Sequence, residues 1–406
     1  MMLQNDSNTA QLLAAANQSL LSTAVRPDIV MERGEGMYLW DTEGKRYLDF
    51  VGGWAVTCLG HSPVVIQQAL SNQAATLVNT SPSFYNKPQL EFARRLTELS
   101  GFERVFFASS GAEANEGAIK LARRHGISNL SGAYEIITTQ NSFHGRTLAT
   151  MSATGKKQWE SLFSPKVPGF IHVPLNDIEA LLAAVNPNTC AIMLELVQGE
   201  GGVHAASQEY VAQLRQICDE TGILLIFDEI QTGLGRTGKL FASEHYAIQS
   251  DVMTLGKGIG GGFPLSALLV KERFNIFEPG DQGGTYSGQP LAMAVGLAVV
   301  NEIVAKELPA KAKQQGTYIV NKLLSIAQQY GLSRIRGKGL LLAFDLPNEQ
   351  AGEVVAECLK EGLLINAPNA RSIRLMPPLI VSKEEIDTMI QLLGEVLAAL
   401  SHNRCL

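Results

Sequence analysis

Two residues in the stretch 223–285 have the types and the order that amine–carbonyl chemistry requires. Asp228 follows the apolar run ILLIF, and Lys257 comes 29 residues later, directly before GIGGGFP. A desolvated lysine amine can attack a carbonyl group and form a Schiff base. A carboxylate can pair with a protonated pyridine nitrogen, and the two groups together are what pyridoxal 5'-phosphate chemistry needs. We therefore expect Asp228 and Lys257 to be catalytic, with this cofactor.

A junction in FFASSGAEAN supplies a candidate phosphate site. Ser110, Gly111 and Ala112 open an expected helix directly after an apolar run. The first amide groups of a helix are free and lie at its positive dipole end, so they hold phosphate well. Helix capping would explain a Ser–Gly pair equally well. Thr285, in GGTY, offers a hydroxyl group for the same phosphate.

Two arginines are suited to binding substrate carboxylates. Arg146 closes the motif FHGRT and Arg374 opens RLMPPL. A guanidinium group can grip a carboxylate with two parallel hydrogen bonds. The ordinary alternatives are a solvated Arg146, an Arg374 that faces solvent from a strand, and a simple turn role for Glu200 in QGEGG.

These motifs span about residues 36–379 and resemble the class III (subgroup II) pyridoxal-phosphate aminotransferases, above all the acetylornithine and ornithine group. The resemblance implies that Phe143 stacks on the cofactor ring and that Ile230 packs on it. It also implies that Gln231 reaches the ring hydroxyl and that His144 belongs to the cofactor site.

The resemblance further implies how substrates are bound. Arg146 would hold the distal carboxylate, and Arg374 the α-carboxylate of glutamate. Glu200 would neutralise Arg374 when the other donor is bound, which gives one site two substrate modes. Thr285 would reach the phosphate from the neighbouring subunit, so the functional unit would be a homodimer.

Three positions depart from the family pattern. Ala112 stands where a threonine is common, so one hydroxyl contact to phosphate is missing while the backbone donors remain. Trp54 occupies a pocket position where relatives carry a smaller residue or a tyrosine, although a core position at the domain junction is the alternative. Gly284 stands where acetylornithine enzymes often have a serine, and GGTY is closer to 4-aminobutyrate aminotransferases.

The implied activity is transfer of the ω-amino group of acetylornithine or ornithine to 2-oxoglutarate, giving the semialdehyde and glutamate, as in arginine biosynthesis. 4-Aminobutyrate and other ω-amino acids stay open as donors. A pyridoxal-dependent aminomutase or racemase and a non-enzymatic protein of the same fold are further alternatives. The intact pair of Asp228 and Lys257, together with the two arginines, favours the transaminase.

These residues need a scaffold that brings distant segments together. Short apolar runs alternate with helical segments, and we expect buried strands at 104–108, 135–138, 170–173, 191–197 and 223–227. The alternation predicts an α/β fold with a largely parallel sheet between helices. The resemblance implies fold-type I, with a seven-stranded type of sheet in the large domain. We predict an N-terminal segment (1–62) that joins the small domain, a large cofactor-binding domain (63–300) and a C-terminal small domain (301–406).

Composition and charge limit the classes of partner that the chain could bind. The 406 residues carry a net charge of −6 without any block of Lys or Arg, which argues against nucleic acid or an anionic membrane as a partner. No apolar run reaches the ~18 residues of a membrane span, and the N-terminus lacks the basic start of a signal peptide. Five cysteines without paired spacing indicate reduced thiols and no metal site. We expect a cytoplasmic enzyme with small-molecule partners.

Overall fold

The computed structural model describes residues 9–402, and its largest sheet positions most of the predicted site. Within these residues the sheet has seven strands in the order β4-β12-β11-β10-β7-β5-β6. Every neighbouring pair is parallel except the two that involve β12, so the α/β, mostly parallel prediction is confirmed. The strands are β4 (Arg104–Ala108), β5 (Glu135–Thr139), β6 (Phe170–Val173), β7 (Thr189–Leu194), β10 (Leu224–Asp228), β11 (Val252–Leu255) and β12 (Ser266–Val270).

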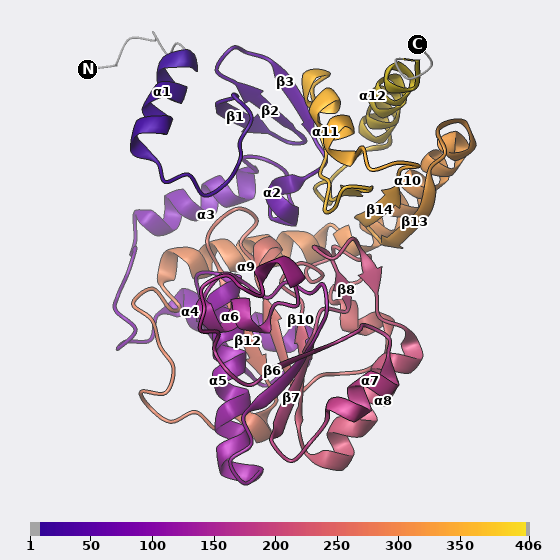
Figure 1. Ribbon diagram of the computed structural model, residues 1–406. Coiled ribbons are helices and arrows are strands. Elements are labelled where there is room, and N and C mark those ends of the chain that lie inside the picture. Colours follow the sequence, from indigo (N-terminus) through magenta and orange to yellow (C-terminus); the bar gives the residue numbers. More distant parts are fainter. Residues whose placement is uncertain (1–8, 403–406) are drawn as a thin grey trace.

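Helices cover both faces of this sheet (Figure 1). On β10, Leu224 and Ile226 belong to the same core cluster as residues of α5 (Gly111–Asn129). Leu225 and Phe227 pack on the opposite side, in the cluster that contains residues of α7 (Ile178–Ala184) and α8 (Gln208–Thr221). Successive strand residues point to opposite faces. Asp228 therefore continues the face of Leu224 and Ile226, toward α5.

The first and last helices, α1 (Thr9–Ser19) and α12 (Lys383–His402), both lie above the large sheet, at the top of Figure 1. The first three strands form a four-stranded sheet with β15 (Leu363–Leu364), which pairs in parallel with β3. A three-stranded sheet has the order β13-β14-β16. This pairing joins a strand of the N-terminal segment to one of the C-terminal part. The division of the chain at residues 62 and 300 stays a prediction. The strands are β1 (Met31–Glu35), β2 (Tyr38–Asp41), β3 (Arg46–Asp49), β13 (Ser333–Lys338), β14 (Leu341–Asp345) and β16 (Ser372–Leu375).

The remaining elements connect and cover these sheets. A two-stranded ribbon of β8 (Val197–Gln198) and β9 (His204–Ala205) carries the QGEGG turn. The other helices are α1 (Thr9–Ser19), α2 (Gly52–Ala55), α3 (Val64–Ala74), α4 (Lys87–Ser100), α6 (Leu148–Ala153), α9 (Pro290–Ala305), α10 (Leu308–Tyr330), α11 (Ala351–Lys360) and α12 (Lys383–His402). Across the described chain, none of the helices is long and apolar enough to cross a bilayer.

The cysteine prediction can be followed at four positions. Cys58, Cys190, Cys218 and Cys358 are buried and free, as expected for reduced thiols. Cys405 lies outside the described residues, as does the beginning of the N-terminal segment, residues 1–8.

A close approach of α10 to the turn between β13 and β14 gives a stability test. Gly316 in α10 is buried, and a Cβ atom there would lie 1.9 Å from the carbonyl oxygen of Gly339. We expect Gly316→Ala to lower the free energy of unfolding by about 1–3 kcal/mol, because backbone must shift to admit the methyl group. This loss exceeds the gain of about 0.5–1 kcal/mol from replacing a helical glycine.

Gly352→Ala in α11 is the matched control, since nothing lies within 4 Å of its added Cβ. Thermal unfolding of the two variants should show a lowered Tm only for Gly316→Ala. Equal melting temperatures would contradict this close approach.

Candidate active site

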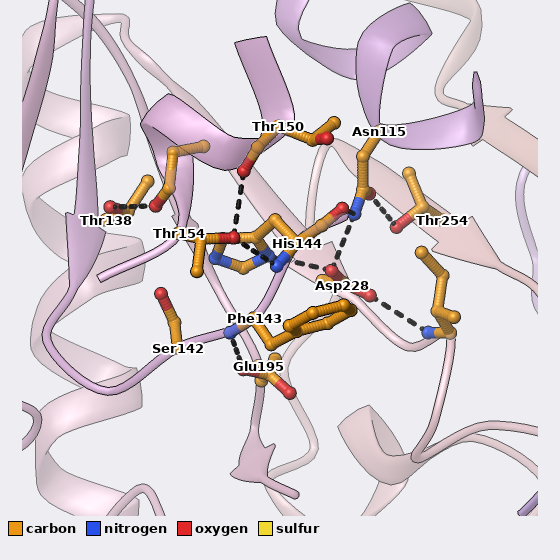
Figure 2. Close-up of polar contacts among 12 residues, drawn as sticks. Asn115, Thr138, Ser142, Phe143, His144, Thr150, Thr154, Glu195, Asp228 and Thr254 are labelled. Carbon is orange, nitrogen blue, oxygen red and sulfur yellow. Dashed lines mark hydrogen bonds and ion pairs between the residues drawn. The ribbon is translucent and has the colours of Figure 1, made fainter. Parts of the chain in front are cut away.

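Asp228 lies at the end of β10 in a fixed hydrogen-bond network. Its Oδ2 accepts hydrogen bonds from Asn115 Nδ2 and His144 Nδ1, both at 2.8 Å, and its Oδ1 accepts from the Ile230 amide at 3.0 Å. Asn115 is itself oriented by the Thr254 hydroxyl, which donates to its Oδ1 at 2.7 Å. Figure 2 shows Asn115 and His144 converging on the carboxylate. The carboxylate is 3% exposed and is thus a preoriented buried charge.

His144 supports that charge. Burial alone would lower the pKa of His144, but the hydrogen bond and the charge of Asp228 outweigh it and raise the pKa above its ordinary value. The Nδ1–H group therefore donates to Asp228. The backbone of His144 is also held, because its amide donates a hydrogen bond to Thr154 Oγ1 at 2.9 Å (Figure 2).

Lys257 follows β11 and enters a short 3-10 turn, η3 (Lys257–Ile259). Its φ of 47° lies in the left-handed region, which a lysine seldom adopts and which is common at functional sites. Burial lowers the pKa of Lys257, although nearby carboxylates, among them Glu200, Glu195 and Asp228, act in the opposite direction. A lowered pKa makes the neutral amine, the nucleophilic form, more available.

The structure brings Lys257 and Asp228 to one cavity of about 250 Å³. Its lining also contains most of the other predicted cofactor residues. The lining residues are Gly111, Ala112, Phe143, His144, Gly145, Arg146, Glu195, Asp228, Ile230, Gln231 and Lys257.

The wall formed by Ile230 depends on two glycines. A Cβ atom on Gly111 would lie 2.9 Å from the Ile230 side chain, and one on Gly256 would lie 3.0 Å from it. Gln231 presents a buried Oε1 that has no hydrogen-bond partner among the described residues, and its Nε2 makes a 3.4 Å bond to the Trp54 carbonyl. Both side chains thus line the cavity where the sequence predicts contacts to a flat ring.

The start of α5 combines a helix cap with free amides. The Glu113 amide donates to Ser110 Oγ, and Glu113 Oε2 accepts from the amides of Ser109 and Ser110. The side chain of Ser110 therefore caps α5, which is the alternative explanation of the Ser–Gly pair. Gly111 and Ala112 follow in the first turn, where amides have no intrahelical partner, and both line the cavity.

A second group of predicted residues forms beside the cavity. Arg374 is fully buried, its Nη2 donates to Glu200 Oε1 at 2.8 Å, and its Nε and Nη2 donate to Asn366 Oδ1. Its Nη1 has no partner among the described residues. The solvent-facing alternative for Arg374 is wrong, because the side chain is held inside by an ion pair and an amide.

Trp54 lies next to this arginine. The indole ring centroid is 5.6 Å from the Arg374 guanidinium carbon, and the residue is 50% exposed. The alternative of a core position for Trp54 is therefore wrong. Its φ of 66° belongs to a left-handed turn, α2, which the Asp49 carboxylate caps by accepting from the amides of Val51 and Gly52.

The remaining predicted residues, Arg146, Gly284 and Thr285, are exposed. Arg146 lines the cavity from an exposed position, and its guanidinium carbon is 4.9 Å from the Trp159 ring centroid. Gly284 and Thr285 are exposed and are absent from the cavity lining of the described chain. The role of Thr285 in a neighbouring subunit stays a prediction.

Four polar residues of the site are not singled out in the sequence. Asn115 and Thr254 orient Asp228, and Asn366 orients Arg374. Glu195 lines the cavity and accepts a hydrogen bond from the Phe143 amide at 2.9 Å; burial raises its pKa to about 7. Only the place of Glu195 at the end of a buried strand could have indicated it, as it did Asp228.

The family described as aminotransferase class-III matches residues 21–397. The chain belongs to the class III aminotransferases. It is 51% identical over 390 residues to an acetylornithine aminotransferase of Ralstonia nicotianae, covering 94% of this chain and 98% of that protein. It is 50% identical over 384 residues to acetylornithine aminotransferase 2 of Bordetella bronchiseptica, covering 94% and 97%.

Solved structures agree with this assignment. The ornithine aminotransferase of Toxoplasma gondii superposes with a TM-score of 0.93 at 30% identity, covering 97% of this chain and 96% of that one. The acetylornithine aminotransferase of Elizabethkingia anophelis gives a TM-score of 0.86 at 31% identity, covering 97% and 99%. The fold is fold-type I, and the protein is a transaminase that depends on pyridoxal phosphate.

The residues present fit this cofactor. The cavity has a buried carboxylate for a pyridine nitrogen, a lysine of lowered pKa for an aldehyde, and helix amides for a phosphate. Gln231, whose Oε1 has no hydrogen-bond partner among the described residues, also lines the cavity. Among the described side chains no cluster of three or more potential metal ligands occurs.

Proposed function

We propose that this transaminase moves the ω-amino group of acetylornithine to 2-oxoglutarate, giving the semialdehyde and glutamate. The observation that carries the proposal is the ion pair of buried Arg374 with Glu200, beside Lys257 and Asp228. A site that takes two substrates in turn needs an α-carboxylate binder that can be neutralised for the other substrate. The relatives named as acetylornithine aminotransferases support this donor first and ornithine second.

The chain's own residues would then act as follows. When bound, pyridoxal phosphate supplies an electron sink for charge that develops on the carbon next to the amine. Asp228 presents a negative charge to the ring nitrogen, and Asn115 and His144 keep it oriented. Lys257 Nζ would take the proton from the carbon that bears the reacting amine and pass it to the aldehyde carbon of the cofactor. Phe143 and Ile230 line the cavity, and they would enclose the ring and exclude water from it.

The arginines orient the two substrates differently. Arg146, at the cavity mouth, would bind the distal carboxylate of either substrate. Arg374 would bind only the α-carboxylate of glutamate or 2-oxoglutarate, after Glu200 has left it. Trp54 lies near Arg374 and would narrow the binding site for the aliphatic part of the amino donor.

The assembly and location are part of the same proposal. Thr285 on its exposed loop would reach the phosphate of a second copy, so that the homodimer completes each site. Four buried, free cysteines suit a reducing, cytoplasmic compartment. The division at residues 62 and 300 would separate the part that holds the cofactor from the part that carries Arg374.

Single-turnover half-reactions with a panel of donors test the donor assignment. Acetylornithine, ornithine and 4-aminobutyrate are each mixed with the cofactor-loaded enzyme, and the cofactor absorbance is followed. We expect the highest kcat/KM with acetylornithine and a return half-reaction that requires 2-oxoglutarate. A higher value with 4-aminobutyrate would support the alternative donor class, and turnover without 2-oxoglutarate would support an aminomutase.

The two arginines give a separate prediction. Arg374→Ala should lower kcat/KM of the glutamate half-reaction by roughly tenfold to a hundredfold, since a charge-assisted bond contributes about 1.5–3 kcal/mol. The ω-donor half-reaction should change far less. Arg146→Ala should lower both half-reactions, because both substrates have a distal carboxylate. Equal losses in the two half-reactions of Arg374→Ala would refute the two-mode site.

A further inference from the structure

Glu200 uses its two carboxylate oxygens on two different cations. Oε1 accepts from Arg374 Nη2 at 2.8 Å, and Oε2 lies 3.3 Å from Lys156 Nζ. Arg374 comes from β16, whereas Lys156 precedes the short 3-10 turn η1 (Lys157–Trp159). The carboxylate therefore bridges two parts of the chain, and the second cation has no part in the mechanism described so far.

The position of Lys156 is fixed by its surroundings. Its Nζ is 5.1 Å from the ring centroid of Phe143 and 5.3 Å from that of Trp159. Its side chain is 16% exposed, while the neighbouring Lys157 is exposed. An ammonium group close to two aromatic rings and a carboxylate is held in place, unlike an ordinary surface lysine. The pair with Glu200 thus lies beside Phe143, which lines the cavity.

Both cations keep Glu200 charged. Burial alone would raise the pKa of Glu200, but Arg374 and then Lys156 outweigh the burial and hold it below its ordinary value. A partly buried carboxylate that loses its counter-charge is strongly destabilised. Glu200 can therefore leave Arg374 readily only where another cation still holds it, and Lys156 is already in contact with it.

We propose that Lys156 is the second anchor of Glu200. When the α-carboxylate of glutamate or 2-oxoglutarate binds Arg374, Glu200 breaks its bond to Arg374 and keeps its bond to Lys156. Lys156 is then a positioning residue for the α-carboxylate half-reaction, and it acts through Glu200 without touching the substrate. This inference rests on the proposed two-mode site.

The proposal predicts an asymmetric effect of removing Lys156. In Lys156→Met, Glu200 has only Arg374 as a partner, so it competes more strongly with the incoming α-carboxylate. We expect the KM for glutamate and for 2-oxoglutarate to rise about tenfold with little change in kcat, since one charge-assisted interaction is lost. The ω-donor half-reaction, in which Glu200 stays on Arg374, should stay within about twofold of wild type.

Two variants serve as controls. Lys156→Arg keeps the positive charge, so its KM for glutamate should stay close to that of the wild type. Lys157→Met removes a neighbouring exposed lysine and should leave both half-reactions unchanged. Far-UV circular dichroism and Tm of all three variants check that each one folds. If Lys156 had only a structural role, Lys156→Met would lower Tm and impair both half-reactions.

Equilibrium binding to the cofactor-loaded enzyme gives a readout apart from activity. Glutarate has two carboxylates and must displace Glu200 from Arg374, whereas butyrate has one and can use Arg146 alone. Calorimetric titration should show glutarate binding weakened about tenfold in Lys156→Met, with butyrate binding unchanged. On a Glu200→Gln background, Lys156→Met should add no further weakening, because the competing charge is already gone.

Several results would overturn the proposal. Equal losses for glutarate and butyrate would mean that Lys156 binds the distal carboxylate directly. No loss for either ligand, or a full loss that persists in the Glu200→Gln background, would remove the anchor role. If the two-mode site itself is wrong, Arg374→Ala will leave the glutamate half-reaction unchanged. That result would also overturn the Lys156 proposal. If only the Lys156 proposal is wrong, the Arg374→Ala asymmetry remains.

Discussion

Lys257→Ala is expected to lower the rate of transamination by about 10²–10⁴-fold or more while the fold persists. General acid–base transfer by a positioned side chain contributes about that factor, and covalent attachment of the cofactor is lost in addition. The lysine lies in a left-handed backbone position that alanine occupies without new contacts, so the surrounding turn should keep its shape. The measurement is the single-turnover rate with donor and, separately, with glutamate.

Chemical labelling checks the same residue independently of rate. Borohydride reduction of the wild-type enzyme should fix the cofactor to the peptide that contains Lys257, and peptide mass analysis identifies the labelled site. Lys239→Ala is the matched control, because this lysine is exposed and lies between Asp228 and Lys257 in the chain. The labelling at Lys257 should be unchanged in this variant. Labelling on any lysine other than Lys257 would contradict the assignment, as would an undiminished rate in Lys257→Ala.

The place of Asp228 follows from the sequence by simple geometry. A run of five apolar residues predicts a buried strand, and parallel strands present their carboxyl ends to a ligand crevice. The structure confirms this strand, and the alternation of side chains along β10 sends Asp228 to the side where α5 packs. The apolar run and the two-residue period of a strand were sufficient to place Asp228, because the strand and the face of each side chain depend only on neighbours in the chain.

The partners of Asp228 could not be predicted in that way. Asn115 is 113 residues away from Asp228, and His144 is 84 residues away. Their meeting depends on which strand lies next to which and on how α5 is rotated about its axis. Local residue patterns specify neither quantity. Lys156 was missed for the same reason, since its contact to Glu200 joins segments 44 residues apart.

Trp54 and Ser110 show where the sequence left two explanations open. For Ser110 the cap was a real alternative, and the reciprocal bonds with Glu113 show that the side chain is engaged in it. For Trp54 a pocket position was expected and a core position was the alternative; the left-handed turn that follows Asp49 leaves the indole half-exposed beside Arg374. Backbone with positive φ at non-glycine residues is hard to foresee, because propensity argues against it.

Asp228→Asn should slow proton removal from the donor carbon by about 10²–10³-fold, the usual effect of losing one preorganised electrostatic group. The side chain keeps its size but loses the charge that would stabilise a protonated ring nitrogen. Asp228 accepts hydrogen bonds at both oxygens, so an amide nitrogen in either place would face an N–H donor. The pKa of His144 should also fall, since burial lowers it and the charge that raised it is gone.

Thr254→Val separates the charge from the packing of the site. It removes the hydroxyl that orients Asn115 but leaves Asp228 charged, so its effect on proton removal should stay below about tenfold. Cofactor should remain bound in both variants, because the α5 amides and Lys257 are untouched. The decisive comparison is the rate of the absorbance change in the donor half-reaction. If Asp228→Asn loses no more than Thr254→Val does, the negative charge at the end of β10 is not what activates the donor.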